Sequence, residues 1–225
     1  MPHHPNAYDQ ALLQIQKQAL SLGQMVRTQL QRAMRSLIEQ DRDLAEAVIA
    51  ADDAVDDLDA VLELAALEII SIQQPLEHEL RFLAAAMRIS RELERIADYS
   101  CDIAESALQL TRRGEGFTPL AALPRMAGLV QAMLERSLEA YRDRDLEAAL
   151  RLDDDDDEAD RSYAAFYQEL SGHLQANPDR VDQAFNTLLI ARYLERIGDH
   201  AVNIAEMLIF SETGERHPFK RKTEP

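Results

Sequence analysis

The sequence predicts an all-α protein made of two tandem antiparallel three-helix bundles related by internal duplication. Three observations lead to this expectation. Ala, Leu, Gln, Glu and Arg dominate the 225 residues, whereas aromatic residues make up only 5%, a composition typical of long helices rather than sheets. Between a few breaking segments the apolar residues follow helical spacing. The two halves of the chain also repeat one another.

Four breaking segments divide the chain: the Gln74-Pro75 step, residues 112–119, the Asn177-Pro178 step and residues 211–218. Proline ends one helix and suits the first turn of the next, and Asn177 is a residue type favoured as an N-cap. Together with the polar joints EQDRD and DRD, these breaks predict six helices, over about residues 8–39, 44–72, 76–110, 120–142, 146–175 and 179–210. The expected domains are residues 1–113, residues 114–212 and a mobile tail, residues 213–225.

The duplication is visible in the letters of the sequence. DRDLAEA at 41–47 returns as DRDLEAA at 143–149. ELERIADYSCDIAE at 92–105 returns as YLERIGDHAVNIAE at 193–206, with eight of fourteen positions identical. Short joints make consecutive helices run antiparallel, so each repeat should form its own three-helix bundle.

Acidic residues form a stripe along the third helix of each repeat. In the first repeat the stripe is Glu94, Asp98, Asp102 and Glu105, and in the second it is Glu195, Asp199, Asn203 and Glu206. Residues four apart share one face of a helix. The opposite face should be buried, and in the first repeat it holds Leu93, Ile96, Ala97, Ser100, Ile103, Ala104 and Ala107.

The second helix of the first repeat carries acids that should meet this stripe. Folding the chain about Gln74-Pro75 sets Asp56 level with Leu93 or Glu94. The same fold sets Asp52 level with Ala97 or Asp98. Two acidic stripes are therefore expected at the same height.

The fifth helix repeats this arrangement with an ambiguity. Folding at Asn177-Pro178 sets Asp160 near Glu195 and Asp156 near Asp199. Counting from the repeated DRDL selects Asp154 and Glu158 instead. The first count is preferred because it runs through the helix pair that must meet, although the acidic run from Asp153 could also be a solvated cluster.

Facing carboxylates repel one another and cost stability unless a cation lies between them. Ligand sets made of oxygen suit hard cations such as Mg²⁺, Ca²⁺, Mn²⁺ or iron. Each predicted site has more carboxylates than one ion needs, which favours bridged, multinuclear sites. The alternative is that the stripes are solvated faces, where Arg91 and Arg95 pair with Glu94 and Asp98.

Composition excludes several classes of function. The net charge of −17 argues against binding to nucleic acids or anionic membranes. The sequence has no stretch of eighteen apolar residues, so no segment is expected to span a bilayer. The N-terminus does not resemble a signal peptide. Cys101 is the only cysteine, so no intrachain disulfide can form, which fits a reducing compartment. The expected location is the cytoplasm.

No catalytic machinery is recognisable. The Glu-x-x-His pattern of di-iron oxidases is missing, as are phosphate loops and nucleophile elbows. His200 is predicted to be a polar surface group rather than a ligand. Cys101 is predicted to be a small core residue rather than a nucleophile. A non-enzyme is therefore expected.

The repeated acidic motifs make the chain resemble the PhoU family of bacterial phosphate-signalling regulators. Two E-R-I-x-D-x-x-x-[D/N] motifs, the D-x-x-V-D stretch of residues 52–56 and the DRDL joints carry the resemblance, over about residues 8–212. It implies a non-catalytic, metal-binding adaptor that negatively regulates phosphate uptake and starvation signalling. The implied metals are iron, manganese or magnesium. The implied partners are the ATPase subunit of the phosphate transporter, a sensor histidine kinase and a second copy in a homodimer.

Carried over by motif position, the implied metal ligands are Asp52, Asp56, Glu94, Asp98 and Asp102 in the first repeat, and Asp156, Asp160, Glu195, Asp199 and Asn203 in the second. Asn203 departs from the pattern because the first repeat has Asp102 there. Three alternatives stay open: a carboxylate-bridged metalloenzyme or iron-handling bundle, a helical scaffold with solvated acids, and an accessory protein of a different phosphate permease.

Overall fold

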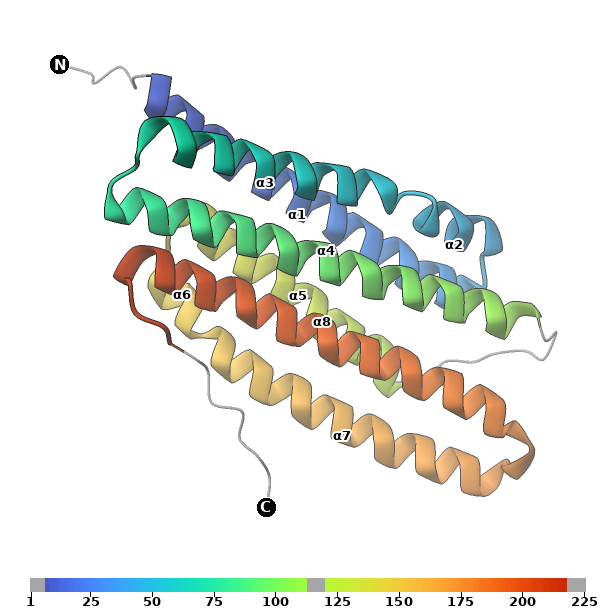
Figure 1. Cartoon of the computed structure of the whole chain (residues 1–225). Coiled ribbons are helices and arrows are strands. Elements are labelled where there is room, and N and C mark those ends of the chain that lie inside the picture. Colours follow the sequence, from blue (N-terminus) through green and yellow to red (C-terminus); the bar gives the residue numbers. More distant parts are fainter. Residues whose placement is uncertain (1–6, 113–119, 218–225) are drawn as a thin grey trace.

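The computed structural model describes residues 7–112 and 120–217 and confirms two antiparallel three-helix bundles. The first repeat contains α1 (Ala7–Glu39), α2 (Arg42–Ile49), α3 (Asp53–Gln73) and α4 (Glu77–Arg112) (Figure 1). The second contains α5 (Ala122–Asp143), α6 (Leu146–Leu150), α7 (Leu152–Ala176), the 3₁₀ turn η1 (Pro178–Arg180) and α8 (Val181–Thr213). Most of the predicted break at residues 112–119 and of the predicted tail at residues 213–225 lies outside the described residues.

The second helix of each repeat is broken, and the prediction of one continuous helix there was wrong. Between α2 and α3 the backbone N–H groups of Ala51 and Asp52 reach back only three residues, to the carbonyls of Val48 at 3.2 Å and Ile49 at 3.3 Å. Such 3₁₀ bonds tighten the turn and redirect the chain. The break at Ala51 could not be found from the sequence because alanine is the best helix former.

Aspartate caps begin α2 and α6, and they define how the repeats correspond. The Asp41 side chain accepts a hydrogen bond from the Leu44 N–H at 3.0 Å, and Asp145 accepts one from the Ala148 N–H at 2.9 Å. The match in letters pairs Asp41 with Asp143, whereas the caps pair Asp41 with Asp145. In the structure, a residue of α1 to α3 therefore corresponds to a residue of α5 to α7 that lies two positions further along the chain than the match in letters suggests.

Other helix ends are fixed by contacts that differ from expectation. Asn177 does not cap the following helix; its side chain donates to the His173 carbonyl at 3.0 Å and closes the end of α7. The start of α5 is held by Glu169 of α7, whose carboxylate accepts from the N–H groups of Ala121 at 2.9 Å and Ala122 at 3.1 Å. A distant residue thus satisfies backbone donors that have no local cap.

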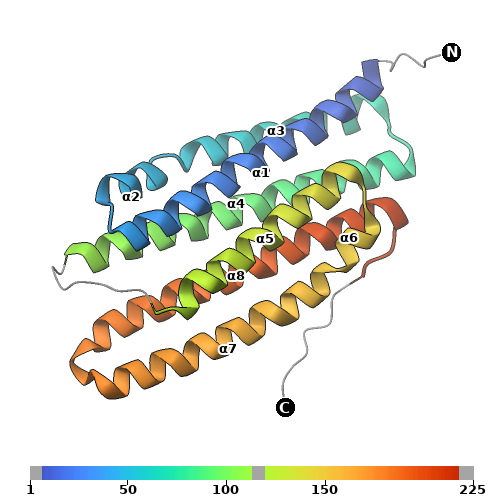
Figure 2. The same ribbon diagram turned by 180° about the vertical axis from the view of Figure 1, so that it is seen from behind.

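The helices form two layers. Helices α4 and α8 run antiparallel at the centre of one layer, with α3 and α7 at its outer edges (Figure 1). Helices α1 and α5 lie on the opposite face (Figure 2). They approach closely at Gly23, where a Cβ would lie 2.5 Å from Cδ2 of Leu138. An ion pair between Arg27 and Glu135 bridges the same two helices.

One hydrophobic cluster extends through both repeats. Its members include Leu93 of α4 and Leu194 of α8, which occupy the same motif position and are both fully buried. The predicted apolar face of α4 is confirmed, since every one of its seven expected residues is buried. The acidic stripes are thereby fixed on the remaining faces of α4 and α8.

Candidate metal-binding site

The α3–α4 hairpin brings the first-repeat acids together as predicted. Asp56 lies close enough to Asp52 and Asp98 that burial and these two negative charges raise its carboxyl pKa above the usual value. Asp102 likewise has a raised pKa because of burial and the charges of Glu105, Asp98 and Asp52. We call Asp52, Asp56, Glu94, Asp98 and Asp102 the first acidic cluster.

Glu94 is the innermost member of this cluster. Only 8% of its surface is exposed. Its Oε1 pairs with Arg91 Nη1 at 2.9 Å, while its Oε2 is enclosed, accepts no hydrogen bond and lies 3.6 Å from Arg95 Nε. Burial and then Asp98 raise its pKa. A buried carboxylate oxygen without a hydrogen bond is unusual, so a solvated face does not describe this residue.

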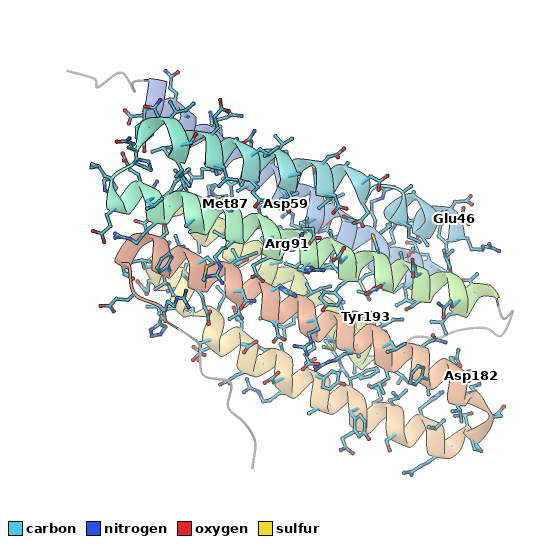
Figure 3. The ribbon with its side chains drawn as sticks, in the orientation of Figure 1. Glu46, Asp59, Met87, Arg91, Asp182 and Tyr193 are labelled. Atoms are coloured by element: carbon cyan, nitrogen blue, oxygen red, sulfur yellow. The ribbon has the colours of Figure 1, made fainter. Side chains whose placement is uncertain are left out.

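Arginines of α4 offset part of the repulsion. Arg95 Nη1 contacts Asp98 Oδ2 at 2.8 Å. Arg91 Nη1 also lies 3.8 Å from Oδ2 of Asp59, whose carboxylate accepts a hydrogen bond from Ser90. Figure 3 shows Asp59 on α3 and Arg91 on α4, on the same face of the molecule. The arginines thus place positive charge beside the acids of both helices.

Gln29 of α1 also contacts the first acidic cluster. The sequence analysis did not predict this contact. Its side-chain N–H donates to Asp52 Oδ1 at 3.1 Å and lies 3.1 Å from Cys101 Sγ. Burial and the adjacent Asp52 raise the pKa of Cys101 to about 12. The thiol therefore stays protonated at neutral pH. Cys101 was predicted to be a core residue, but it is only partly buried and packs against the edge of the core.

The second acidic cluster comprises Asp156, Asp160, Glu195, Asp199 and Asn203. Asp156 lies beside Asp160 and Asp199, and burial followed by these charges raises its pKa to about 6. Glu195 pairs with Arg192, and Asp199 Oδ2 lies 3.0 Å from Arg196 Nη1. The predicted meeting of α7 and α8 acids is confirmed at Asp156.

The structure resolves which acids of the run on α7 face α8. Counting from the caps, Asp156 corresponds to Asp52 and Asp160 to Asp56. Glu158 lies beside Asp155, which pairs with Arg136 of α5 at 2.9 Å. The alternative pair, Asp154 and Glu158, followed from the displaced letter match.

His200 is not the surface group that was predicted. It is partly buried between α4 and α8, where its Nδ1 lies 2.6 Å from Glu92 Oε2. Asn203 Nδ2 donates to the same oxygen at 2.9 Å. Burial acts to raise the pKa of Glu92, but these two hydrogen bonds and the nearby charges of His200 and Arg88 together lower it. Helical periodicity gave no signal for this contact because it depends on how the repeats pack.

The side chains of both clusters are of the type that binds hard cations, because every member except Asn203 is a carboxylate. Glu94 Oε2 also offers an enclosed oxygen without a hydrogen bond. Within residues 7–112 and 120–217, however, no three His, Cys, Asp or Glu side chains converge in a way that could hold a metal ion. The clusters bring candidate ligands to the same level, with arginines beside them.

A pH-dependent stability is expected from Asp156. Its pKa is raised from 3.8 to about 6 in the folded protein, so between these values the folded state binds more protons than the unfolded state. Stability therefore falls as pH rises through this window. In a chelator, Asp156→Asn should gain about 1–2 kcal/mol at about pH 7, after allowance for solvent screening, and nothing below about pH 4. Urea unfolding across this pH range measures it.

The control for this prediction is Asp154→Asn, which removes an exposed charge from the same acidic run. It should show no comparable gain at neutral pH. An equal gain in both variants would mean that general charge repulsion, rather than the contact of Asp156 with Asp199, is responsible.

None of the helices in the described parts of the chain is long and apolar enough to cross a membrane.

The fold and the two clusters define a duplicated helical-bundle protein in which each repeat sets an acidic helix pair on the outside of a shared core. A family model described as PhoU domain matches residues 19–107 and again 123–208. The chain belongs to the PhoU family.

Named relatives and a solved structure match this chain over almost its whole length. A Caulobacter vibrioides protein named phosphate-specific transport system accessory protein PhoU homolog is 34% identical over 213 residues, which cover 95% of this chain and 93% of that protein. A homolog of the same name from Zymomonas mobilis is also 34% identical, over 96% of this chain and 91% of its own. The crystal structure of PhoU from Pseudomonas aeruginosa matches with a TM-score of 0.88 at 29% identity, covering 92% of this chain and all of that one.

Proposed function

We propose that this protein is a cytoplasmic, non-catalytic accessory protein of a phosphate transport system. The observation that carries the proposal is the match of both repeats to the PhoU domain, together with curated relatives that bear this function in their names over nearly their full length. The regulator acts negatively on phosphate uptake and on the starvation response. Its partners are the ATPase subunit of the transporter and a sensor histidine kinase, and it works as a homodimer.

Divalent cations form the second part of the proposal. Iron, manganese or magnesium binds to the two acidic clusters, where the raised pKa values of Asp56, Glu94, Asp102 and Asp156 reflect burial and a repulsion that the neighbouring arginines offset only in part. Glu94 Oε2 supports this because it is enclosed and accepts no hydrogen bond. The members of the two clusters would hold the ions, and their side chains would have to draw together on binding, since no three of them converge on one point in the described residues. A bound cation would supply the positive charge that fixes each hairpin.

The regulatory part is tested by recovery of partners. The full-length protein, coupled to resin and incubated with extract of phosphate-replete cells from which its own gene is deleted, should retain the transporter ATPase and the kinase. The same deletion strain should express its phosphate-starvation genes in phosphate-rich medium. Recovery of neither partner, together with silent starvation genes, would refute the proposal.

A further inference from the structure

Helix α3 has an outward face that is apolar but uncovered. The helix forms one outer edge of its layer, and among the described helices it contacts only α1 and α4 (Figure 1). Leu64 is 68% exposed and Ile72 is 64% exposed, and Val61 and Leu67 are exposed beside them. At 1.5 Å per residue, the band from Val61 to Ile72 is about 16 Å long, or about three helical turns. Exposed apolar patches rimmed by polar residues typically mark interaction sites.

The equivalent face of the second repeat is not apolar. Counting from the Asp41 and Asp145 caps pairs Leu62 with Phe166, and both of these side chains are fully buried. In the same register the counterparts of the four exposed α3 residues are Ala165, Gln168, Ser171 and Ala176. The fold therefore does not require large apolar side chains at these positions, and the band on α3 is a property of the first repeat alone.

A groove between α3 and α1 continues the band inward. Its volume is about 600 Å³, and Ile69 and Ile72 of α3 and Ile15 of α1 contribute apolar walls. Gln18 also lines it, and the Oε1 atom of this residue is enclosed and accepts no hydrogen bond. The part of α1 before Gln18 has no counterpart in α5, which begins at the equivalent position, Ala122. The groove is therefore built from an extension of α1 that is specific to the first repeat.

The charges around the band indicate what kind of molecule would cover it. Helix α3 holds six acids and no lysine or arginine. Asp57 precedes Val61 by one turn and Glu68 follows Leu64 by one turn, so both exposed acids flank the band on the same face. The same face of a second copy would offer only further acids, whereas a partner rich in lysine or arginine is complementary in charge. Two helices that enclose an apolar groove suit an amphipathic helix laid along it.

We propose that the α1–α3 groove and the apolar face of α3 bind a basic amphipathic helix of a partner protein. The apolar side of that helix would cover Leu64 and enter the groove beside Ile72. Its lysines or arginines would lie beside Asp57 and Glu68, and one of them would donate to Gln18 Oε1. The inference rests on the proposed function, in which the protein acts by contacting other proteins, and it makes no use of the two acidic clusters.

The test is the binding of a synthetic basic helix to the full-length protein. The probe is a peptide of about 14 residues with leucines and one tryptophan on one face and lysines on the other. Because the chain itself has no tryptophan, the fluorescence reports only on the peptide. Wild type should bind the peptide and shift its emission to the blue. A peptide of the same composition in scrambled order has no apolar face and should not bind.

Substitutions on exposed positions locate the binding surface. Leu64→Gln copies the second repeat and should weaken binding at least about tenfold, because a central apolar anchor carries much of the energy of an interface. Glu68→Gln should weaken it less and reduce its dependence on salt. Gln168→Ala, at the equivalent position on α7, is the matched control and should bind like wild type. Bound peptide should slow amide exchange in α3 and in the part of α1 before Gln18.

No binding to wild type, equal binding of the scrambled peptide, or equal binding to Leu64→Gln would overturn the inference. Analytical ultracentrifugation covers the other occupant of this face. A wild-type dimer that Leu64→Gln abolishes and that excludes the peptide would assign the face to a second copy and would also overturn the inference. The proposed function fails by a separate result, when wild type recovers neither the transporter ATPase nor the kinase from extract.

Discussion

Replacing Asp98 and Asp199 together by asparagine is expected to remove most of the metal bound to the protein. Asp98 acts on Asp56, Glu94 and Asp102, and Asp199 acts on Asp156, so each change affects the centre of a cluster. Loss of a direct ligand should weaken binding by at least about tenfold, since even an outer partner contributes that much. Plasma mass spectrometry of protein purified without chelator or histidine tag measures the metal content.

The same double variant should be more stable than wild type once metal is removed. Each substitution removes a negative charge from a group of neighbouring acids without changing the shape of the side chain, so repulsion is lost and packing is kept. The ion pairs with Arg95 and Arg196 are also lost, but pairs that are this exposed contribute little. Thermal unfolding in a chelator measures the gain. Added cation should then raise the melting temperature of wild type and leave the variant unchanged.

A matched control carries the same change in charge away from the clusters. Asp43 and Asp154 are both exposed, and the Asp43→Asn, Asp154→Asn protein should keep its metal. If wild type and both double variants contain no metal and none responds to added cations, the clusters are not cation sites. The regulatory proposal would then rest on family membership alone.

The second large effect is expected at Leu93. This side chain is fully buried in the cluster that extends through both repeats, and a buried leucine cut to alanine costs about 2–5 kcal/mol. Urea unfolding should show this loss as a single transition. Because α4 packs against α8, amide exchange should accelerate in both repeats together, which mass spectrometry of peptides can follow.

Leu64→Ala is the matched control, because Leu64 on α3 is 68% exposed. It should change stability by no more than about 0.5 kcal/mol. If Leu93→Ala accelerates exchange only in residues 7–112, the repeats unfold independently, and the shared core does not make them one cooperative unit.

Helical periodicity predicted a large part of this molecule because it reports directly on which side of a helix is buried. The apolar face around Leu93 and the meeting of Asp156 with Asp199 both follow from counting residues through a hairpin. The proline steps placed the hairpin turns, since proline limits where a helix can continue. These features depend only on the local geometry of a helix or a hairpin, which can be worked out from a single sequence.

What could not be predicted depends on packing between segments far apart in the chain. The breaks before Asp53 and Leu152 have no glycine or proline to mark them. His200 and Asn203 reach Glu92 only because α4 and α8 lie side by side. Gln29 could not be recognised as a partner of Asp52 without knowing which turn of α1 faces α3.

The packing of α4 against α8 has a consequence for how such a molecule can diversify. A symmetric pair of identical chains would carry every substitution twice, so a glutamate at the position of Glu92 would face the same neighbour on both sides. Here both halves belong to one polypeptide, and a change on one side leaves the other untouched. Glu92 can therefore meet His200 and Asn203 while Tyr193 meets Tyr99. Joining the halves covalently lets each hairpin acquire its own chemistry within a common framework.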